Sequence, residues 1–163
     1  MNRRMSIVAS AMNERNEMWN TASFRIAGDA LRPDQMTTIL GLEPTRSGVK
    51  GERHSRGHGS VSRTSFWLLK CPLSDSLPLT EHLKWLLDVF EPKFNSINSI
   101  AEGSTIMFLC GFAPGSGQVG FTLDAKTLQR IAALGVPLSI NLYPPESAES
   151  EMIRPAASPQ PAS

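Results

Sequence analysis

The sequence predicts an α+β domain in which a mixed or antiparallel sheet carries helices mainly on one face. Residues 22–26 and 138–142 alternate apolar and polar side chains, which is typical of strands with one buried face. Residues 79–90 instead repeat leucine at helical spacing. Strand-like and helix-like segments alternate along the chain with turn signals between them, which indicates hairpins as well as crossover connections.

The first strand and the first helix are expected near the N-terminus. Ala22, Phe24 and Ile26 alternate with polar neighbours and predict a strand. Pro33 lies where a helix of about two turns should begin, and Gly41 supplies its left-handed stop. The inward stripe of this helix is predicted to comprise Met36, Ile39 and Leu40.

The next strong strand is expected over Thr64–Lys70, where Trp67 lies in an apolar run and is predicted to be buried. The main core helix should follow and end at Glu91-Pro92, because a proline disfavours helical geometry in the residue before it. Its predicted inward side chains are Leu79, Leu83, Leu86, Leu87 and Phe90.

The second half of the chain should complete the sheet. Thr105–Phe112 is nearly all apolar and predicts a central strand covered on both faces, followed by a hairpin strand over Gln118–Leu123. Asp124 should cap a third helix that Gly135 ends, before the final strand. This helix is expected to turn Leu128, Ile131 and Ala132 inward. The predicted order, β-α-β-β-α-β-β-α-β, is related to a ferredoxin-like core.

Length and composition predict one domain over residues 21–143. Residues 1–20 are expected to form a flexible N-terminal segment, and the Pro-, Ser- and Ala-rich residues 144–163 a disordered tail. No apolar run approaches the roughly 20 residues that span a bilayer, and the N-terminus is a poor signal peptide, so a cytoplasmic location is expected. Cys71 and Cys110 lie in apolar, strand-like segments and should be buried thiols.

One segment, residues 45–64, is unusually basic, and we call it the basic stretch. It contains five basic residues and one acidic residue, Glu52, which gives it a formal charge of +4 in a chain whose net charge is +1. Such segregation can steer an anionic partner, although solvated loops of this composition are common. The residues expected to bind a partner are Arg46, Lys50, Arg53, His54, Arg56, His58 and Arg63.

No motif in the sequence predicts catalysis, a cofactor or a metal site. Residues 115–120 match G-x-G-x-x-G, but a strand rather than a helix is expected to follow, so a tight turn is favoured over a phosphate cradle. His54 and His58 are four residues apart among glycines and serines that disfavour a helix, and they have no third ligand nearby. His82 is expected at the boundary of the core helix rather than as a base.

Several segments resemble a known bacterial family. They are the Leu40–Thr45 stretch, the Lys50-Gly51-Glu52 triplet, Trp67, and Leu134-Gly135 with Ile140 and Tyr143. Over roughly residues 23–143 the chain is similar to the family catalogued as domain of unknown function 4279. The resemblance implies a small bacterial cytosolic domain and implies no site residues.

Two function classes therefore compete. The first is a non-enzymatic binding module, such as an accessory, inhibitor or immunity-type protein, that presents the basic stretch to an acidic protein partner. The second is a nucleic-acid or nucleotide binder, in which arginines contact phosphates and Phe66 or Trp67 stacks on a base. The near-zero net charge favours the first. An enzyme whose site is assembled from distant residues is a third possibility.

Overall fold

A mixed sheet forms one layer of the structure, a computed structural model that describes residues 18–52, 61–114 and 120–143. Its strands are β1 (Trp19–Gly28), β2 (Arg46–Gly48), β3 (Ser65–Lys70), β4 (Thr105–Ala113) and β5 (Leu138–Leu142). They lie in the order β2-β3-β1-β4-β5. β1 pairs antiparallel with both β3 and β4, and β2 pairs antiparallel with β3. β4 and β5 are parallel.

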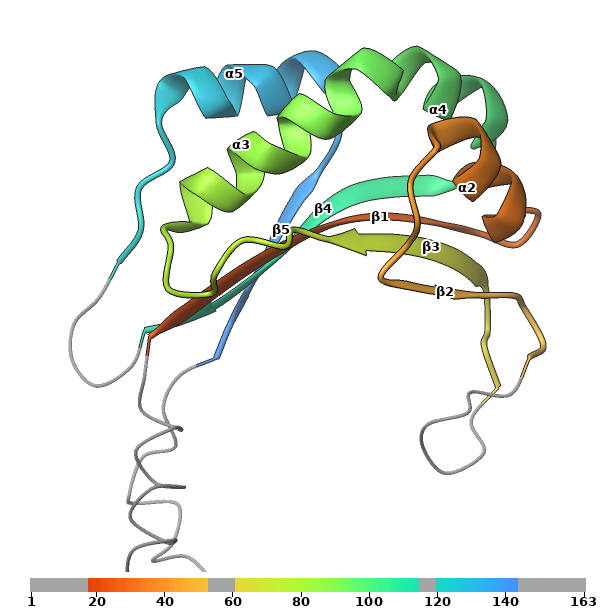
Figure 1. Cartoon of the computed structure of the whole chain (residues 1–163), viewed down its shortest axis with the longest axis horizontal. Coiled ribbons are helices and arrows are strands. Elements are labelled where there is room, and N and C mark those ends of the chain that lie inside the picture. The colour runs from red at the N-terminus through yellow and green to blue at the C-terminus, as the bar shows by residue number, and fades with distance from the viewer. Residues whose placement is uncertain (1–17, 53–60, 115–119, 144–163) are drawn as a thin grey trace, which may run out of the picture.

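The helices lie together on one side of this sheet, as Figure 1 shows. They are α2 (Pro33–Leu40), α3 (Leu79–Phe90), the 3-10 turn η1 (Glu91–Lys93), α4 (Phe94–Ile100) and α5 (Ala125–Leu134). The predicted α+β class, with a mixed sheet and helices on one face, is therefore confirmed. α5 connects β4 to β5 and so supplies the crossover that a parallel pair requires.

Local signals fix the helix ends where they were expected. Pro33 occupies the first turn of α2, and Gly41 ends this helix with a φ of 62°. The Asp124 carboxylate accepts a hydrogen bond from the Thr127 N–H at 2.8 Å and so caps α5, which Gly135 ends with a φ of 64°. Each of these four residues acts on backbone groups within one helical turn, so its effect can be predicted from the local sequence.

Aromatic side chains form the centre of the core between the sheet and α3. Phe24 stacks on Phe90 with ring centroids 3.9 Å apart. Trp67 is fully buried, as predicted, meets Phe90 edge-on, and donates its indole N–H to the Thr37 hydroxyl at 3.1 Å. The core helix also buries its predicted residues, Leu79, Leu83, Leu86, Leu87 and Phe90.

A charged clamp joins the two longest helices at the surface. The Arg130 guanidinium of α5 donates to both carboxylate oxygens of Glu91, at 2.8 and 2.7 Å, and to the Asp88 carboxylate at 2.7 Å. These contacts raise the pKa of Arg130 above its ordinary value. The two-pronged geometry holds α5 against the end of α3.

Several expectations about the second half of the chain were wrong. Residues 120–123 form no strand, because the free edge of β4 pairs with β5 instead of with a hairpin neighbour; residues 118 and 119 lie outside the described residues. β4 is an interior strand, as predicted, because it pairs with both β1 and β5, but the middle strand is β1 and the non-core side of β4 is only partly covered. The core helix α3 does end at Phe90, directly before Glu91-Pro92, as predicted, but η1 and α4, which were not predicted, follow it at once. The predicted ferredoxin-like order is therefore not confirmed.

Some predicted inward side chains are exposed. Ile39 of α2 and Leu128 of α5 are each 46% exposed, and Ala132 of α5 is also at the surface, whereas Met36, Leu40 and Ile131 are buried as expected. Buried Thr127 takes part of the inward face of α5. The apolar stripes of these short helices are therefore narrower than their sequences indicate.

The first strand begins at Trp19, two residues before the predicted domain boundary at 21. The predicted flexible segment, residues 1–20, falls mostly outside the described residues, and the predicted tail, residues 144–163, falls wholly outside them. In the described part of the chain, no helix is long and apolar enough to cross a membrane.

Candidate functional site

The described residues include only part of the predicted binding set. Arg46 is exposed on β2, Lys50 follows this strand, and Arg63 is exposed shortly before β3. The Lys50 ammonium pairs with the Asp29 carboxylate, so this cation is already partly neutralised. Four predicted residues, Arg53, His54, Arg56 and His58, lie outside the described residues.

Two backbone hydrogen bonds join residues 51 and 52 of the basic stretch to Ser62, and we call this pairing the hairpin base. The Gly51 N–H donates to the Ser62 carbonyl at 2.9 Å, and the Ser62 N–H donates to the Glu52 carbonyl at 2.9 Å. Gly51 adopts a φ of 88°, which favours glycine at this turn. The Glu52 carboxylate accepts from the Val49 N–H at 3.2 Å, so the single acid of the stretch makes a local hydrogen bond.

The sheet has a second face, away from the helices, that we call the open face (Figure 1). Side chains alternate along a strand, so the residues of β1 that lie between the buried core residues Ala22, Phe24 and Ile26 point to this side. None of the described helices covers it. Its described side chains include Ser23, Arg25 and Ala27 of β1, Phe66, Leu68 and Lys70 of β3, Met107 and Leu109 of β4, and Arg46 of β2.

The strand register brings two arginines onto one row of the open face. Arg46 lies opposite Leu68, Leu68 opposite Arg25, and Arg25 opposite Met107. Directly opposite residues of neighbouring strands have Cβ atoms about 5 Å apart. The row therefore alternates a cation with an aliphatic side chain across four strands.

Aromatic packing adds to this surface beside the row. The Arg25 guanidinium lies 6.0 Å from the centroid of the Phe66 ring, within the range of a cation–π contact. A Cβ atom on Gly48 would lie 2.8 Å from the Phe66 ring, so the glycine lets this ring lie against the edge strand. Phe66 and Trp67 are adjacent in sequence but belong to opposite faces of the sheet.

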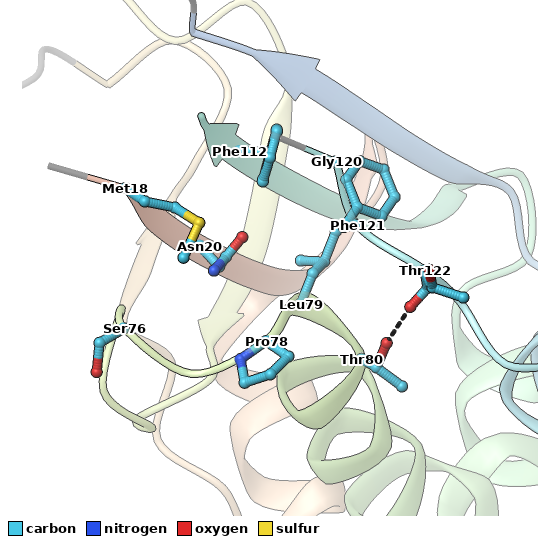
Figure 2. Close-up of a pocket in the computed structure, with 10 residues that line it drawn as sticks. All are labelled: Met18, Asn20, Ser76, Pro78, Leu79, Thr80, Phe112, Gly120, Phe121 and Thr122. Atoms are coloured by element: carbon cyan, nitrogen blue, oxygen red, sulfur yellow. Dashed lines mark hydrogen bonds between the residues drawn. The ribbon is translucent and has the colours of Figure 1, made fainter. Parts of the chain in front are cut away.

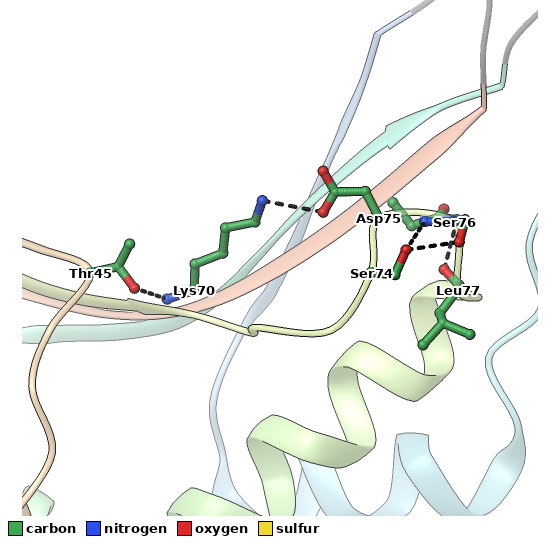
Figure 3. A network of polar contacts seen from close by, with 7 residues as sticks. Thr45, Lys70, Ser74, Asp75, Ser76 and Leu77 are labelled. Carbon is green, nitrogen blue, oxygen red and sulfur yellow. Dashed lines mark hydrogen bonds and ion pairs between the residues drawn. The ribbon is translucent and has the colours of Figure 1, made fainter.

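Lys70 of β3 takes part in a network of polar contacts, as Figure 3 shows. Its ammonium lies 3.2 Å from the Asp75 carboxylate, on the side of the sheet away from α3, and its backbone N–H donates to the Thr45 hydroxyl at 2.9 Å. By contrast, no carboxylate of the described residues lies within ion-pair distance of Arg25, Arg46 or Arg63. Among the residues that the structure describes, these three arginines therefore have no ion-pair partner.

Burial keeps the described candidates for nucleophile or base in their neutral forms. It raises the pKa of the Cys110 thiol to about 12 and raises that of Cys71 above its ordinary value. It lowers the pKa of His82, which is fully buried rather than at the helix boundary as expected. The chemistry that the described residues offer at the open face is thus attraction of anions and apolar contact.

Sequence reasoning missed Arg25 and Lys70, which lie outside the basic stretch but share the open face with Arg46. The signal that could have found Arg25 is its place between Phe24 and Ile26, since the residue between two buried strand positions points to the other face. Residues 115–119 of the G-x-G-x-x-G match lie outside the described residues, and α5 begins only at Ala125.

Comparison with known proteins identifies the family of this chain. Searches of curated proteins and of solved structures found no match. The family model described as Domain of unknown function (DUF4279) matches residues 17–145, which confirms the resemblance seen in the sequence. The chain therefore belongs to the DUF4279 family.

Proposed function

We propose that this domain is a non-enzymatic bacterial binding module of the cytoplasm that holds an acidic protein partner, as an accessory, inhibitor or immunity-type protein does. The observation that carries the proposal is the row of Arg46, Leu68, Arg25 and Met107 on the open face. Cations without carboxylate partners attract an acidic surface, and the aliphatic side chains between them offer apolar contact once it arrives.

The basic stretch shares Arg46 with this row. It continues from β2, which carries Arg46, and returns through the hairpin base to β3, which carries Leu68. A partner that contacts β2 would therefore meet both the row and the residues of the basic stretch. We expect these charges to act mainly on the association rate, because long-range attraction acts before contact.

Two sets of charge reversals test the proposal. One variant carries Arg25→Glu and Arg46→Glu on the open face, and the other carries Arg53→Glu, Arg56→Glu and Arg63→Glu in the basic stretch. The matched control, Lys126→Glu, reverses an exposed cation on α5, in the helical layer. Arg46, Arg63 and Lys126 are exposed and Arg25 is half-buried. Substitutions at the surface usually alter stability by less than about 0.5 kcal/mol, so we expect all three variants to fold, and circular dichroism checks each of them.

The readout is capture from a bacterial lysate, with bound proteins identified by mass spectrometry and their association measured by surface plasmon resonance. The wild type and Lys126→Glu should retain the same acidic protein, and both multiple variants should associate with it more slowly, most clearly at low salt. If folded variants capture that protein at the wild-type rate, the proposed surface is wrong.

A nucleic-acid binder is the second candidate, favoured by the contact of Arg25 with Phe66 on the open face. An aromatic ring beside a cation is an arrangement on which an unpaired base can stack. Fluorescence anisotropy with a single-stranded oligonucleotide tests this candidate. Binding that falls steeply with salt and is lost in Phe66→Ala, with no protein captured, would replace the first proposal with this one.

A further inference from the structure

A cavity of about 310 Å³ lies beside the first turn of α3 (Figure 2). The start of β1, the end of β4 and the segment before α5 complete its walls. The walls are mainly apolar and include Met18, Leu79, Phe112 and Phe121. Phe112 and Phe121 meet edge-on with ring centroids 5.1 Å apart.

One polar side chain, Asn20, is buried at this cavity and is only 3% exposed. Its amide nitrogen donates to the Leu77 carbonyl at 3.0 Å, and its backbone N–H donates to the Asp75 carbonyl at 2.7 Å. Because the Leu77 carbonyl can only accept, the nitrogen must face Leu77, and this contact fixes the orientation of the amide.

The other end of the amide is unsatisfied. The Asn20 Oδ1 atom accepts no hydrogen bond from any residue that the structure describes. In Figure 2 this oxygen points toward the space between Phe112 and Leu79. A buried acceptor without a donor is unfavourable, so a molecule that brings an N–H or O–H group to this point would gain from the contact.

The remaining polar groups narrow the chemistry of such a molecule. The Thr80 hydroxyl donates to the Thr122 carbonyl at 2.6 Å, so its hydrogen is not available to a ligand (Figure 2). Pro78 precedes the first residue of α3, and no side chain caps this helix. The positive end of the helix dipole therefore lies beside the cavity and disfavours a cationic ligand.

We propose that this cavity binds a small, neutral, largely apolar molecule that carries one N–H or O–H donor for Asn20 Oδ1. The volume is about twice that of a cavity of roughly 150 Å³ that holds benzene, so a bicyclic aromatic ring fits. The edges and faces of Phe112 and Phe121 offer aromatic contacts to such a ring. The site shares no residue with the open face and does not depend on the function proposed above.

Indole and 1-methylindole form a matched pair of probes, since the methyl group removes the donor and leaves the bicyclic ring. Each is titrated into ¹⁵N-labelled full-length protein and followed by two-dimensional NMR. Indole should bind with a dissociation constant below about 1 mM and shift the Asn20 side-chain amide, and 1-methylindole should bind at least tenfold more weakly. Equal affinity for the two probes would overturn the assigned role of Asn20.

Two variants locate the binding. Phe121 is 37% exposed, so Phe121→Ala should leave the fold intact, remove one wall and weaken indole binding about tenfold or more. Ile39→Ala, which shortens a 46% exposed side chain on α2, is the matched control and should bind indole as the wild type does. The site is refuted if indole causes no shifts up to its solubility limit, or if Phe121→Ala binds it unchanged.

Discussion

Replacing Trp67 by alanine tests the two-faced arrangement of the sheet most directly. The side chain is fully buried between β3 and the helical layer, packs edge-on against Phe90, and donates to Thr37. Truncation of a buried tryptophan typically costs about 3–5 kcal/mol in the free energy of unfolding. The lost hydrogen bond should add little, because half-buried Thr37 can turn its hydroxyl to water. We therefore expect Trp67→Ala to destabilise the protein by about 3–5 kcal/mol.

The adjacent residue provides the control. Leu68 belongs to the open face and is half-buried, so Leu68→Ala should cost about 1 kcal/mol, well below the loss at Trp67. Urea unfolding followed by circular dichroism measures both values. A loss below about 1 kcal/mol for Trp67→Ala, or equal losses for the two variants, would contradict the assignment of these residues to opposite faces.

Three further predictions concern buried or clamped groups. Burial lowers the pKa of His82, so below about pH 6.5 the unfolded state binds more protons than the folded state, and the free energy of unfolding should fall as the pH drops. In urea unfolding, the stability of His82→Gln should depend less on pH in that range. Cys71 and Cys110 should resist a thiol reagent at pH 7 until the protein is unfolded, and rapid labelling of the native protein would show that they are accessible. Arg130→Gln should lower stability by about 1 kcal/mol in thermal unfolding, with a smaller loss in high salt, and an unchanged melting temperature would show that the clamp contributes nothing.

The features predicted correctly are those that depend on a few neighbouring residues. Pro33 and Gly41 set the ends of α2, and Asp124 and Gly135 set those of α5, because a cap acts through backbone groups within one turn. The leucine repeat of α3 was also readable, since its apolar face is wide and spans three turns.

The errors arose where distant segments compete for the same position. Residues 118–123 follow a strand after turn residues and therefore predicted a hairpin, but β5 takes the free edge of β4. Ile39 and Leu128 fit helical stripes, yet the sheet beneath these short helices leaves them at the surface. Local periodicity predicts neither the pairing of β4 nor the exposure of these two side chains, because both depend on which distant segments pack against them.

The candidate sites also depend on register. Arg25 and Arg46 are separated by a helix in the chain, and only the pairing of β1 with β3 and of β3 with β2 brings them onto one row. The sequence singled out Arg46 through local charge density, whereas Arg25, alone among apolar residues, gave no such signal. Asn20 was missed for a similar reason, because its buried oxygen is identified only by the position of the Leu77 carbonyl.

The two proposed sites recognise opposite chemistries and can therefore be separated experimentally. The open face offers Arg25 and Arg46, which have no ion-pair partner among the described residues, and attraction between charges at a surface is long-ranged and weakened by salt. The cavity offers a buried acceptor among aromatic rings, where binding depends on contact and is nearly independent of ionic strength. Reversal of Arg25 and Arg46 should therefore slow capture of an acidic partner and leave indole binding unchanged, while Phe121→Ala should have the opposite pattern. If both variants impaired both activities, the sites would be coupled through β1, which contributes Arg25 to one and Asn20 to the other.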